Sequence, residues 1–274
     1  MSHTIAIPVV ALSLLAFAAP AVDTWDLKPA ALAAFERYVR LTEARMEGET
    51  SFKTAFLWID RQPTNQKGDN YARLQRGEVV VSKLETRDGG KEIESPDSML
   101  HHWIGTVLLP GVKIDRAIAF VQDYEKYPTL FQPMIQRAKI VSHTGNTFVV
   151  QMRTSAKKII TVTLDGDYAV EYRTLTPAHT FTRSVAANFF EVSSPGTTSE
   201  TRTAADTIAS YLWRLNTYCS FEQRNEGTYE QCESISLTRG IPYLVAPLVR
   251  PFASSIPRET LEQTLGKVRS GLAK

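Results

Sequence analysis

The chain has 274 residues, of which 43 % are apolar, 22 % charged and 9 % aromatic, and its formal net charge is +2. This composition supplies enough apolar side chains for a substantial core, so it excludes an intrinsically disordered chain and a small disulfide-dependent scaffold. Because 31 basic residues are balanced by 29 acidic ones, the overall charge does not favour nucleic acid as a partner.

The N-terminal segment is typical of an export signal. Residues Ile5 to Ala19 form an apolar run that is too short for a membrane span but suits the hydrophobic region of a signal peptide. Small residues allow cleavage after Ala18 or after Ala21, although the usual basic residues before the run are missing. We expect a leader over residues 1–21, with a buried N-terminal helix or an uncleaved anchor as the alternatives. No cysteine stands at the expected cleavage site, so we expect a periplasmic or secreted protein rather than a lipoprotein.

Two helices are predicted in the first half of the remaining chain. Apolar residues recur along one side of residues 29–47, and Gly48 follows them as an end signal. The second helix is expected after Pro110-Gly111, with Asp115 as its cap, and it ends before Pro128. In the segment between these two helices, the residue pattern changes to a period of about two. This pattern predicts strands over residues 55–60, 78–84 and 101–109.

Strands dominate the next hundred residues. The alternation of Ile160, Val162 and Leu164 with threonines predicts a sheet with one covered and one wetter face. A stretch rich in Ser, Thr, Pro and Gly, residues 193–206, is expected to be a long loop. The expected strands are residues 137–142, 147–154, 159–164, 168–174, 180–192, 210–223 and 228–238.

The C-terminal part combines a proline-rich apolar segment with an amphipathic helix. Residues 241–252 contain three prolines, so we do not expect them to form one regular helix. Residues 257–272 carry an apolar stripe that includes Leu261 and Leu265, which predicts a helix. Together these elements predict a single α+β domain over residues 22–274, with the last helix across the concave face of a curved antiparallel sheet.

Two cysteines flank a predicted hairpin. Cys219 and Cys232 lie on either side of the turn 225–227, so a cross-strand disulfide is compatible with an oxidising compartment. Strand alternation opposes this bond if the large apolar residues of both strands share one face of the sheet. Trp213 is in phase with Cys219 whereas Ile235 is out of phase with Cys232, so the two sulfurs would then lie on opposite faces. A β-bulge would reconcile the two observations, and the sequence leaves both states open.

One segment resembles a family signature. Residues 123–133, DYEKYPTLFQP, resemble the D-y-x-x-Y-P-x-f-x-P pattern of START-like (SRPBCC) proteins, which include polyketide cyclases and coenzyme-Q-binding proteins. Residues 101–105, 212–216 and 255–259 are similar to segments of exported bacterial members of this superfamily. The resemblance covers essentially the whole mature chain. It implies a helix-grip fold whose sheet and C-terminal helix enclose an apolar cavity for a lipid, sterol, quinone or polyketide.

The implied cavity suggests a set of lining residues. Large aromatics in this set belong to the core in any case, and some of them also line the cavity. By default residues 241–252 pack on the sheet, but they are also candidates for a movable gate or for transient membrane contact. The expected lining residues are Trp103, Phe131, Trp213, Ile235, Leu244, Leu248, Phe252, Leu261 and Leu265.

No complete catalytic or metal-binding motif is present in the sequence. His101 and His102 are adjacent on a predicted strand, so we expect one buried and one solvent-facing histidine and no metal site. Glu233 shares a strand phase with Ile235, which would let it point into the cavity and pair with Arg214 on the neighbouring strand. Its simpler interpretation is a structural ion pair or a solvated edge.

Three functions are compatible with these features. The first is an exported, non-enzymatic binding or carrier protein for an apolar ligand, without a cofactor. The second is a cyclase, aromatase or hydrolase that uses Glu233 with Arg214 or a histidine as acid and base. The third is a protein-interaction domain of the cell envelope whose interior is filled by its own side chains. The sequence identifies no ligand, no protein partner and no oligomeric state.

Overall fold

The computed structural model describes residues 29–157, 161–204, 210–240 and 246–273, and it describes only the backbone of 187 and 246–254. The predicted leader lies outside these residues. The helices are α1 (Pro29–Thr50), α2 (Thr64–Gln75), α3 (Ile114–Gln122), α4 (Tyr127–Leu130) and α5 (Ala246–Leu272), with 3-10 turns at Trp58–Arg61 and Tyr124–Lys126.

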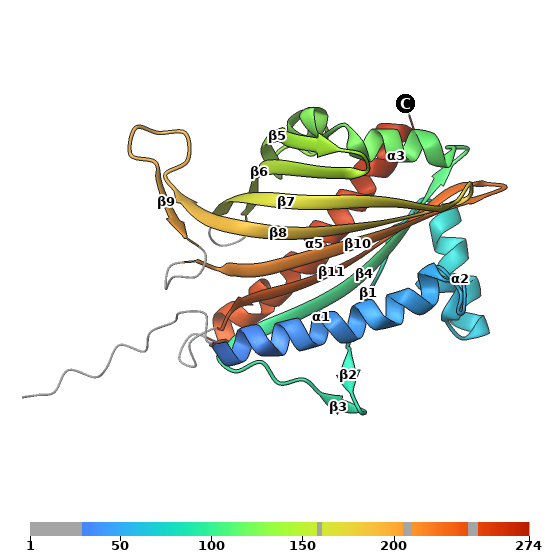
Figure 1. The fold of residues 1–274 in the computed structure, drawn as a ribbon, viewed down its shortest axis with the longest axis horizontal. Helices are drawn as coiled ribbons and strands as arrows, with labels where there is room; N and C mark the ends of the chain where they lie inside the picture. The colour runs from blue at the N-terminus through green and yellow to red at the C-terminus, as the bar shows by residue number, and fades with distance from the viewer. Residues whose placement is uncertain (1–28, 158–160, 205–209, 241–245, 274) are drawn as a thin grey trace, which may run out of the picture.

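The strands form one large sheet and a separate hairpin. Within the described residues the large sheet is antiparallel and has the order β1-β4-β11-β10-β8-β7-β6-β5, with β9 beside β8 (Figure 1). The strands are β1 (Val80–Lys83), β2 (Arg87–Asp88), β3 (Lys91–Glu92), β4 (Ser98–Pro110), β5 (Ile135–Thr144), β6 (Thr147–Lys157), β7 (Thr161–Thr176), β8 (His179–Ser193), β9 (Thr201–Ala204), β10 (Leu212–Arg224) and β11 (Gly227–Arg239).

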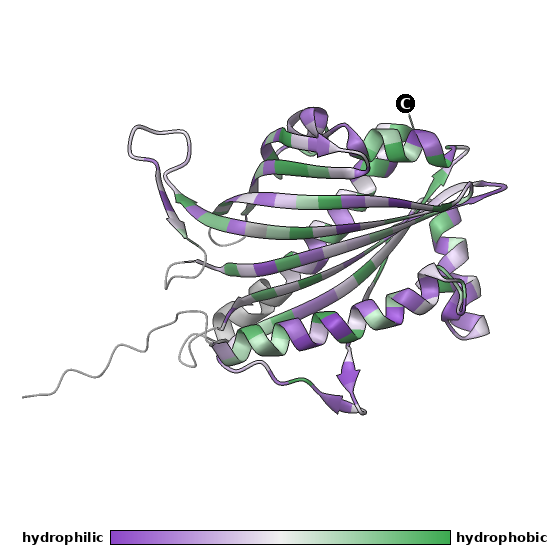
Figure 2. Cartoon of the chain, in the orientation of Figure 1, coloured by the Kyte–Doolittle hydropathy of each residue, from purple (hydrophilic) through white to green (hydrophobic). Residues whose placement is uncertain are grey.

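Helix α1 covers one face of the sheet. Its apolar side packs onto strands β8, β10 and β11, and the sheet contributes aromatic and aliphatic side chains of alternate residues to this contact. Apolar and polar residues therefore alternate along much of the sheet (Figure 2). The cluster contains Phe35, Tyr38, Val39, Met46, Phe181, Trp213, Tyr218, Ile235 and Leu237.

Helix α5 lies on the other face of the sheet (Figure 1). Leu261 and Leu265 pack against β4 at Gly105, where a Cβ atom would lie 2.7 Å from Cδ1 of Leu265. The missing side chain therefore lets the helix approach the strand closely. This arrangement confirms the predicted α+β fold, a curved antiparallel sheet with a long C-terminal helix across one face.

The predicted strand over residues 55–60 is wrong. These residues lead into a 3-10 turn at Trp58–Arg61, and the unpredicted helix α2 follows. Helix α2 has a mostly polar sequence with Gly68 in its interior, and Leu74 is its one buried residue. A helix with so little apolar surface has almost no periodic signal in its sequence.

Several element boundaries also differ from the prediction. Helix α5 begins at Ala246 rather than at residue 257, although Pro251 and Pro257 each remove a backbone donor from it. Helix α1 extends to Thr50, and the predicted loop 193–206 contains strand β9. Strand β7 is continuous where two strands were expected. None of the helices in the described part of the chain is long and apolar enough to cross a membrane.

The packing of α5 on β4 gives a first prediction. Because Leu265 is fully buried, we expect Leu265→Ala to lower the free energy of unfolding by about 2–5 kcal/mol, through lost burial and the cavity left behind. Urea denaturation measures this change. Val141→Ala on the exposed part of β5 is the control, with an expected change within about 0.5 kcal/mol. Equally small effects at both positions would contradict the packing.

Candidate ligand cavity

A cavity of about 360 Å³ lies between the sheet and α5. Strands β6, β7, β8, β10 and β11 form its floor, and the segment from α3 to α4 closes one side. Aliphatic and aromatic side chains make up most of its lining, which suits an apolar molecule. Representative lining residues are Phe131, Met134, Met152, Leu164, Leu215 and Leu261.

Strand β11 presents small and polar side chains, rather than its large apolar ones, to the cavity. Successive side chains of a strand point to opposite faces, so the apolar residues of β11 lie under α1 instead. The apolar set includes Ile235 and Leu237. The residues on the cavity face are Glu230, Cys232, Ser234, Ser236 and Thr238.

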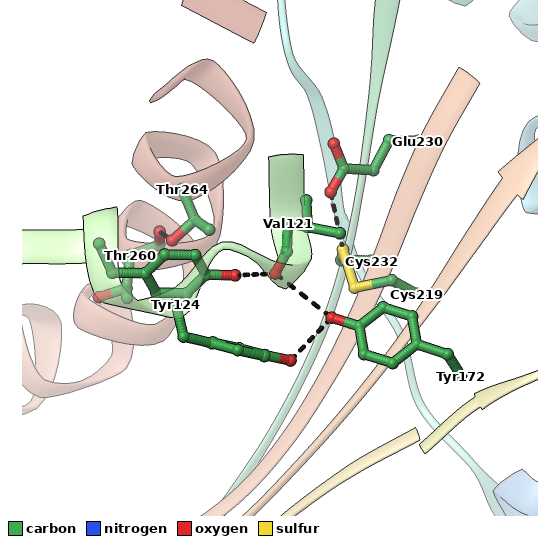
Figure 3. Close-up of a disulfide and its surroundings, with 9 residues drawn as sticks. Val121, Tyr124, Tyr172, Cys219, Glu230, Cys232, Thr260 and Thr264 are labelled. Atoms are coloured by element: carbon green, nitrogen blue, oxygen red, sulfur yellow. Dashed lines mark hydrogen bonds between the residues drawn. A yellow bond between two sulfur atoms is a disulfide. The ribbon is translucent and has the colours of Figure 1, made fainter. Parts of the chain in front are cut away.

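A disulfide bond crosses the floor of the cavity. Cys219 and Cys232 are direct partners in the β10–β11 register and are bonded to each other (Figure 3). The parity argument against this bond is wrong for two reasons. A bulge between Leu212 and Arg214 turns Trp213 to the α1 face, and Ile235 belongs to that face as well. Glu230 lies near both sulfurs, but these are joined and supply no thiolate for a metal ion.

Beside the disulfide, two tyrosine hydroxyls donate to the backbone carbonyl of Val121, and a third, that of Tyr124, bonds to Tyr172 (Figure 3). The Tyr127 hydroxyl donates to this carbonyl at 2.6 Å and the Tyr172 hydroxyl at 3.3 Å. The hydroxyl oxygens of Tyr124 and Tyr172 are 2.7 Å apart. Burial raises the pKa of Tyr124 to about 12 and the pKa values of the other two tyrosines as well. The cluster is therefore neutral at ordinary pH.

Glu230 is a buried carboxyl group at the same end of the cavity (Figure 3). Its Oε2 atom has no hydrogen-bond partner among the described residues, and its Oε1 atom lies 3.7 Å from Sγ of Cys232. Burial raises the pKa of Glu230 to about 8, because nothing compensates for the lost hydration of the charged form. Glu230 is not among the site residues predicted from the sequence, although it is in phase with Cys232 and an acid among core residues is itself a signal.

Glu233 lies on the opposite face, so the prediction that it points into the cavity and pairs with Arg214 is wrong. Nε2 of His102 is 2.5 Å from Oε1 of Glu233, and Arg45 of α1 forms an ion pair with the same oxygen. Burial by itself would raise the pKa of Glu233, but the hydrogen bond from His102 and the charge of Arg45 hold it below its usual range. The guanidinium of Arg214 donates to the backbone carbonyl of Trp213. The simpler interpretation of Glu233, a structural ion pair, fits this position.

Both histidines are buried, with 6 % of His101 and 2 % of His102 exposed, so the expectation of one solvent-facing histidine is wrong. They do point to opposite faces. Nε2 of His101 is 3.0 Å from Oγ1 of Thr238 on the cavity side, and Nδ1 of His102 is 2.8 Å from the hydroxyl of Tyr38 on the α1 side. Burial and the charge of Lys83 lower the pKa of His101 to about 4, so this ring is neutral at pH 7.

The other predicted lining residues are distributed over several environments. Trp213 and Ile235 pack with α1, so the prediction that they line the cavity is wrong. Trp103 packs against the core cluster beside α5, outside the described lining, and Leu265 fills the contact with β4. Phe131 and Leu261 line the cavity. Leu244, and the side chains of Leu248 and Phe252, lie outside the described residues.

Three solved structures are distantly similar to this chain. Neither a protein-family model nor a curated protein matches the chain. A STAR-related lipid transfer protein from Xanthomonas axonopodis has 16 % identity and a TM-score of 0.45, over 71 % of this chain and 99 % of that chain. The ZhuI aromatase/cyclase from Streptomyces sp. R1128 has 10 % identity and a TM-score of 0.44, over 64 % and 94 %. The lipid transfer and protein localization domain of human StarD13 has 9 % identity and a TM-score of 0.42, over 77 % and 98 %.

The raised pKa of Glu230 predicts a pH-dependent stability. Between the usual pKa of 4.5 and about 8 the folded chain holds a proton that the unfolded chain has lost. Across this window Glu230 therefore lowers the free energy of unfolding as the pH rises, by about 1.4 kcal/mol per pH unit. Above about pH 8 its contribution no longer changes with pH.

Glu230→Gln carries no titrating group, so its stability relative to the wild type should rise from about pH 5 to pH 8 and then level off. Chemical denaturation at several pH values measures this difference, in which the contributions of other titrating groups cancel. Parallel stability curves for the two proteins would show that the carboxyl group is not protonated in the folded state.

Proposed function

We propose that the protein binds an apolar small molecule of the lipid, sterol, quinone or polyketide type between the sheet and α5, and carries it without catalysing a reaction. The observation that supports this proposal is the cavity of about 360 Å³ with its mainly apolar lining. Small-molecule sites in proteins enclose roughly 300–1,000 Å³, so the volume falls at the small end of that range.

The alternative functions have less support. The enzyme hypothesis relied on Glu233 with Arg214 or a histidine as acid and base, but Glu233 is held by His102 and Arg45 on the face away from the cavity. The interaction-domain hypothesis required an interior filled by side chains, whereas the described residues surround a cavity that their side chains do not fill. Binding of an apolar ligand is therefore the function that the geometry favours.

Filling the cavity should abolish ligand binding. We suggest N-phenyl-1-naphthylamine as the probe, because it is uncharged and its fluorescence rises in an apolar site. Ser234→Phe places a ring in the space that the ligand occupies, and we expect it to weaken probe binding by about tenfold or more. Ser270→Phe, at an exposed position near the end of α5, is the control and should bind like the wild type.

The proposal would be contradicted if the wild type failed to enhance probe fluorescence. It would also be contradicted if Ser234→Phe folded normally and bound the probe as tightly as Ser270→Phe, because the probe would then bind elsewhere.

We further propose that residues 1–21 direct export and that the mature protein is a single START-like domain over residues 22–274. The support is the apolar run that ends near Ala19 and the small residues around it. Expression of the full chain in a bacterial host should yield a periplasmic or secreted protein whose intact mass corresponds to cleavage after Ala18 or after Ala21. A cytoplasmic protein that retains Met1 to Ala21 would refute the leader.

A further inference from the structure

We propose that Glu230 is the polar anchor of the cavity, where its carboxylic acid donates a hydrogen bond to an uncharged carbonyl oxygen of the ligand. The inference rests on the proposed function and narrows its ligand class. It assigns a neutral ketone- or quinone-like molecule, rather than an ammonium compound or a plain hydrocarbon.

Glu230 lies where a ligand could reach it, and the described residues around it do not complete its hydrogen bonds. Only 3 % of the residue is exposed, and its direct neighbours on the adjacent strands are the apolar residues Val107 and Phe221. Sγ of Cys232 carries no hydrogen in the disulfide, so its contact with Oε1 does not provide a donor. Oε2 has no partner among the described residues. A buried polar group in this state destabilises the folded protein, and a ligand hydrogen bond would offset that loss.

The neighbouring tyrosines use their protons within their own cluster. Tyr127 and Tyr172 both donate to the carbonyl of Val121, so the proton between Tyr124 and Tyr172 comes from Tyr124. No tyrosine proton of this cluster remains for a ligand. Beside this cluster the acid group of Glu230 keeps a donor for a ligand, because its Oε2 atom has no partner among the described residues.

The charge environment favours the neutral acid as that donor. Among the described lining residues there is no Lys, Arg, His or Asp, so a carboxylate at Glu230 would have no counter-ion in the cavity. Burial raises its pKa to about 8, so the group is mainly a carboxylic acid at pH 7. The groups facing it from α3 to α4 and from β7 are Tyr124, Tyr127 and Tyr172, whose pKa values are also raised. Among these four groups, Glu230 is therefore the one that changes its charge between pH 6 and pH 9.

Three ligands of nearly the same shape test the inference: 2-acetonaphthone, which has a carbonyl oxygen, 2-ethylnaphthalene, which has none, and 1-(2-naphthyl)ethylamine, which is cationic. Each competes with bound N-phenyl-1-naphthylamine. The measured quantity is the affinity for the ketone divided by the affinity for the hydrocarbon, so that differences in hydrophobicity cancel between protein variants. We expect Glu230→Leu to lower this ratio by about tenfold and Glu230→Gln, which keeps a donor, to retain most of it.

Two further measurements separate the role of Glu230 from a general structural effect. In the wild type the ratio should fall between about pH 6.5 and pH 9.5 as the acid ionises, and in Glu230→Gln it should not. This comparison does not need the leucine variant to fold. Glu233→Gln removes the other buried glutamate of β11, on the α1 face, and should leave the ratio unchanged.

Each outcome decides between the proposals. An equal ratio in the wild type and in folded Glu230→Leu, or a ratio that does not vary with pH, overturns the role of Glu230 and leaves the cavity as a binding site. Preferential binding of the amine that is lost in Glu230→Gln overturns it in favour of a cation site. Failure of the probe and of all three ligands to bind overturns both this inference and the proposed function.

Discussion

Strand β11 divides its side chains between two covered faces of the sheet, and the positions of α1, α5 and the cavity depend on this division. The apolar residues of β11, such as Ile235 and Leu237, pack against α1 and hold that helix on the sheet. The alternate residues Glu230, Cys232, Ser234, Ser236 and Thr238 face the cavity instead. Helix α5 contacts β4 closely at Gly105, and the cavity lies between this helix and the strands on the other side of β11.

The two buried glutamates of β11 lie on opposite faces of the sheet, and their pKa values shift in opposite directions. On the α1 face, Glu233 is satisfied by His102 and Arg45 and remains ionised. On the cavity face, Glu230 has neither a cation nor a complete set of hydrogen bonds among the described residues, so it retains its proton. Glu233 thus forms a structural ion pair, whereas Glu230, three residues earlier on the same strand, is available to a ligand.

The sequence predicted much of the architecture but little of the site. Long alternating strands and the stripe with Leu261 and Leu265 have strong periodic signals, and the sheet and α5 follow from them. The site was misassigned because apolar residues were expected to face the cavity. In a sheet that is covered on both sides, parity says only which residues share a face, and it does not say which face each set occupies. The assignment of Glu233 to the cavity, and the omission of Glu230, both result from this ambiguity.

The central claim, that the interior of this fold holds an apolar molecule, can be tested on the protein from its own host. Native mass spectrometry of protein purified without detergent should show a bound species that organic solvent extracts, and the cavity-filling Ser234→Phe variant should lack it. If the wild type shows only the mass of the polypeptide, both as purified and after incubation with lipids extracted from the host, then the cavity does not hold such a ligand and the account is wrong.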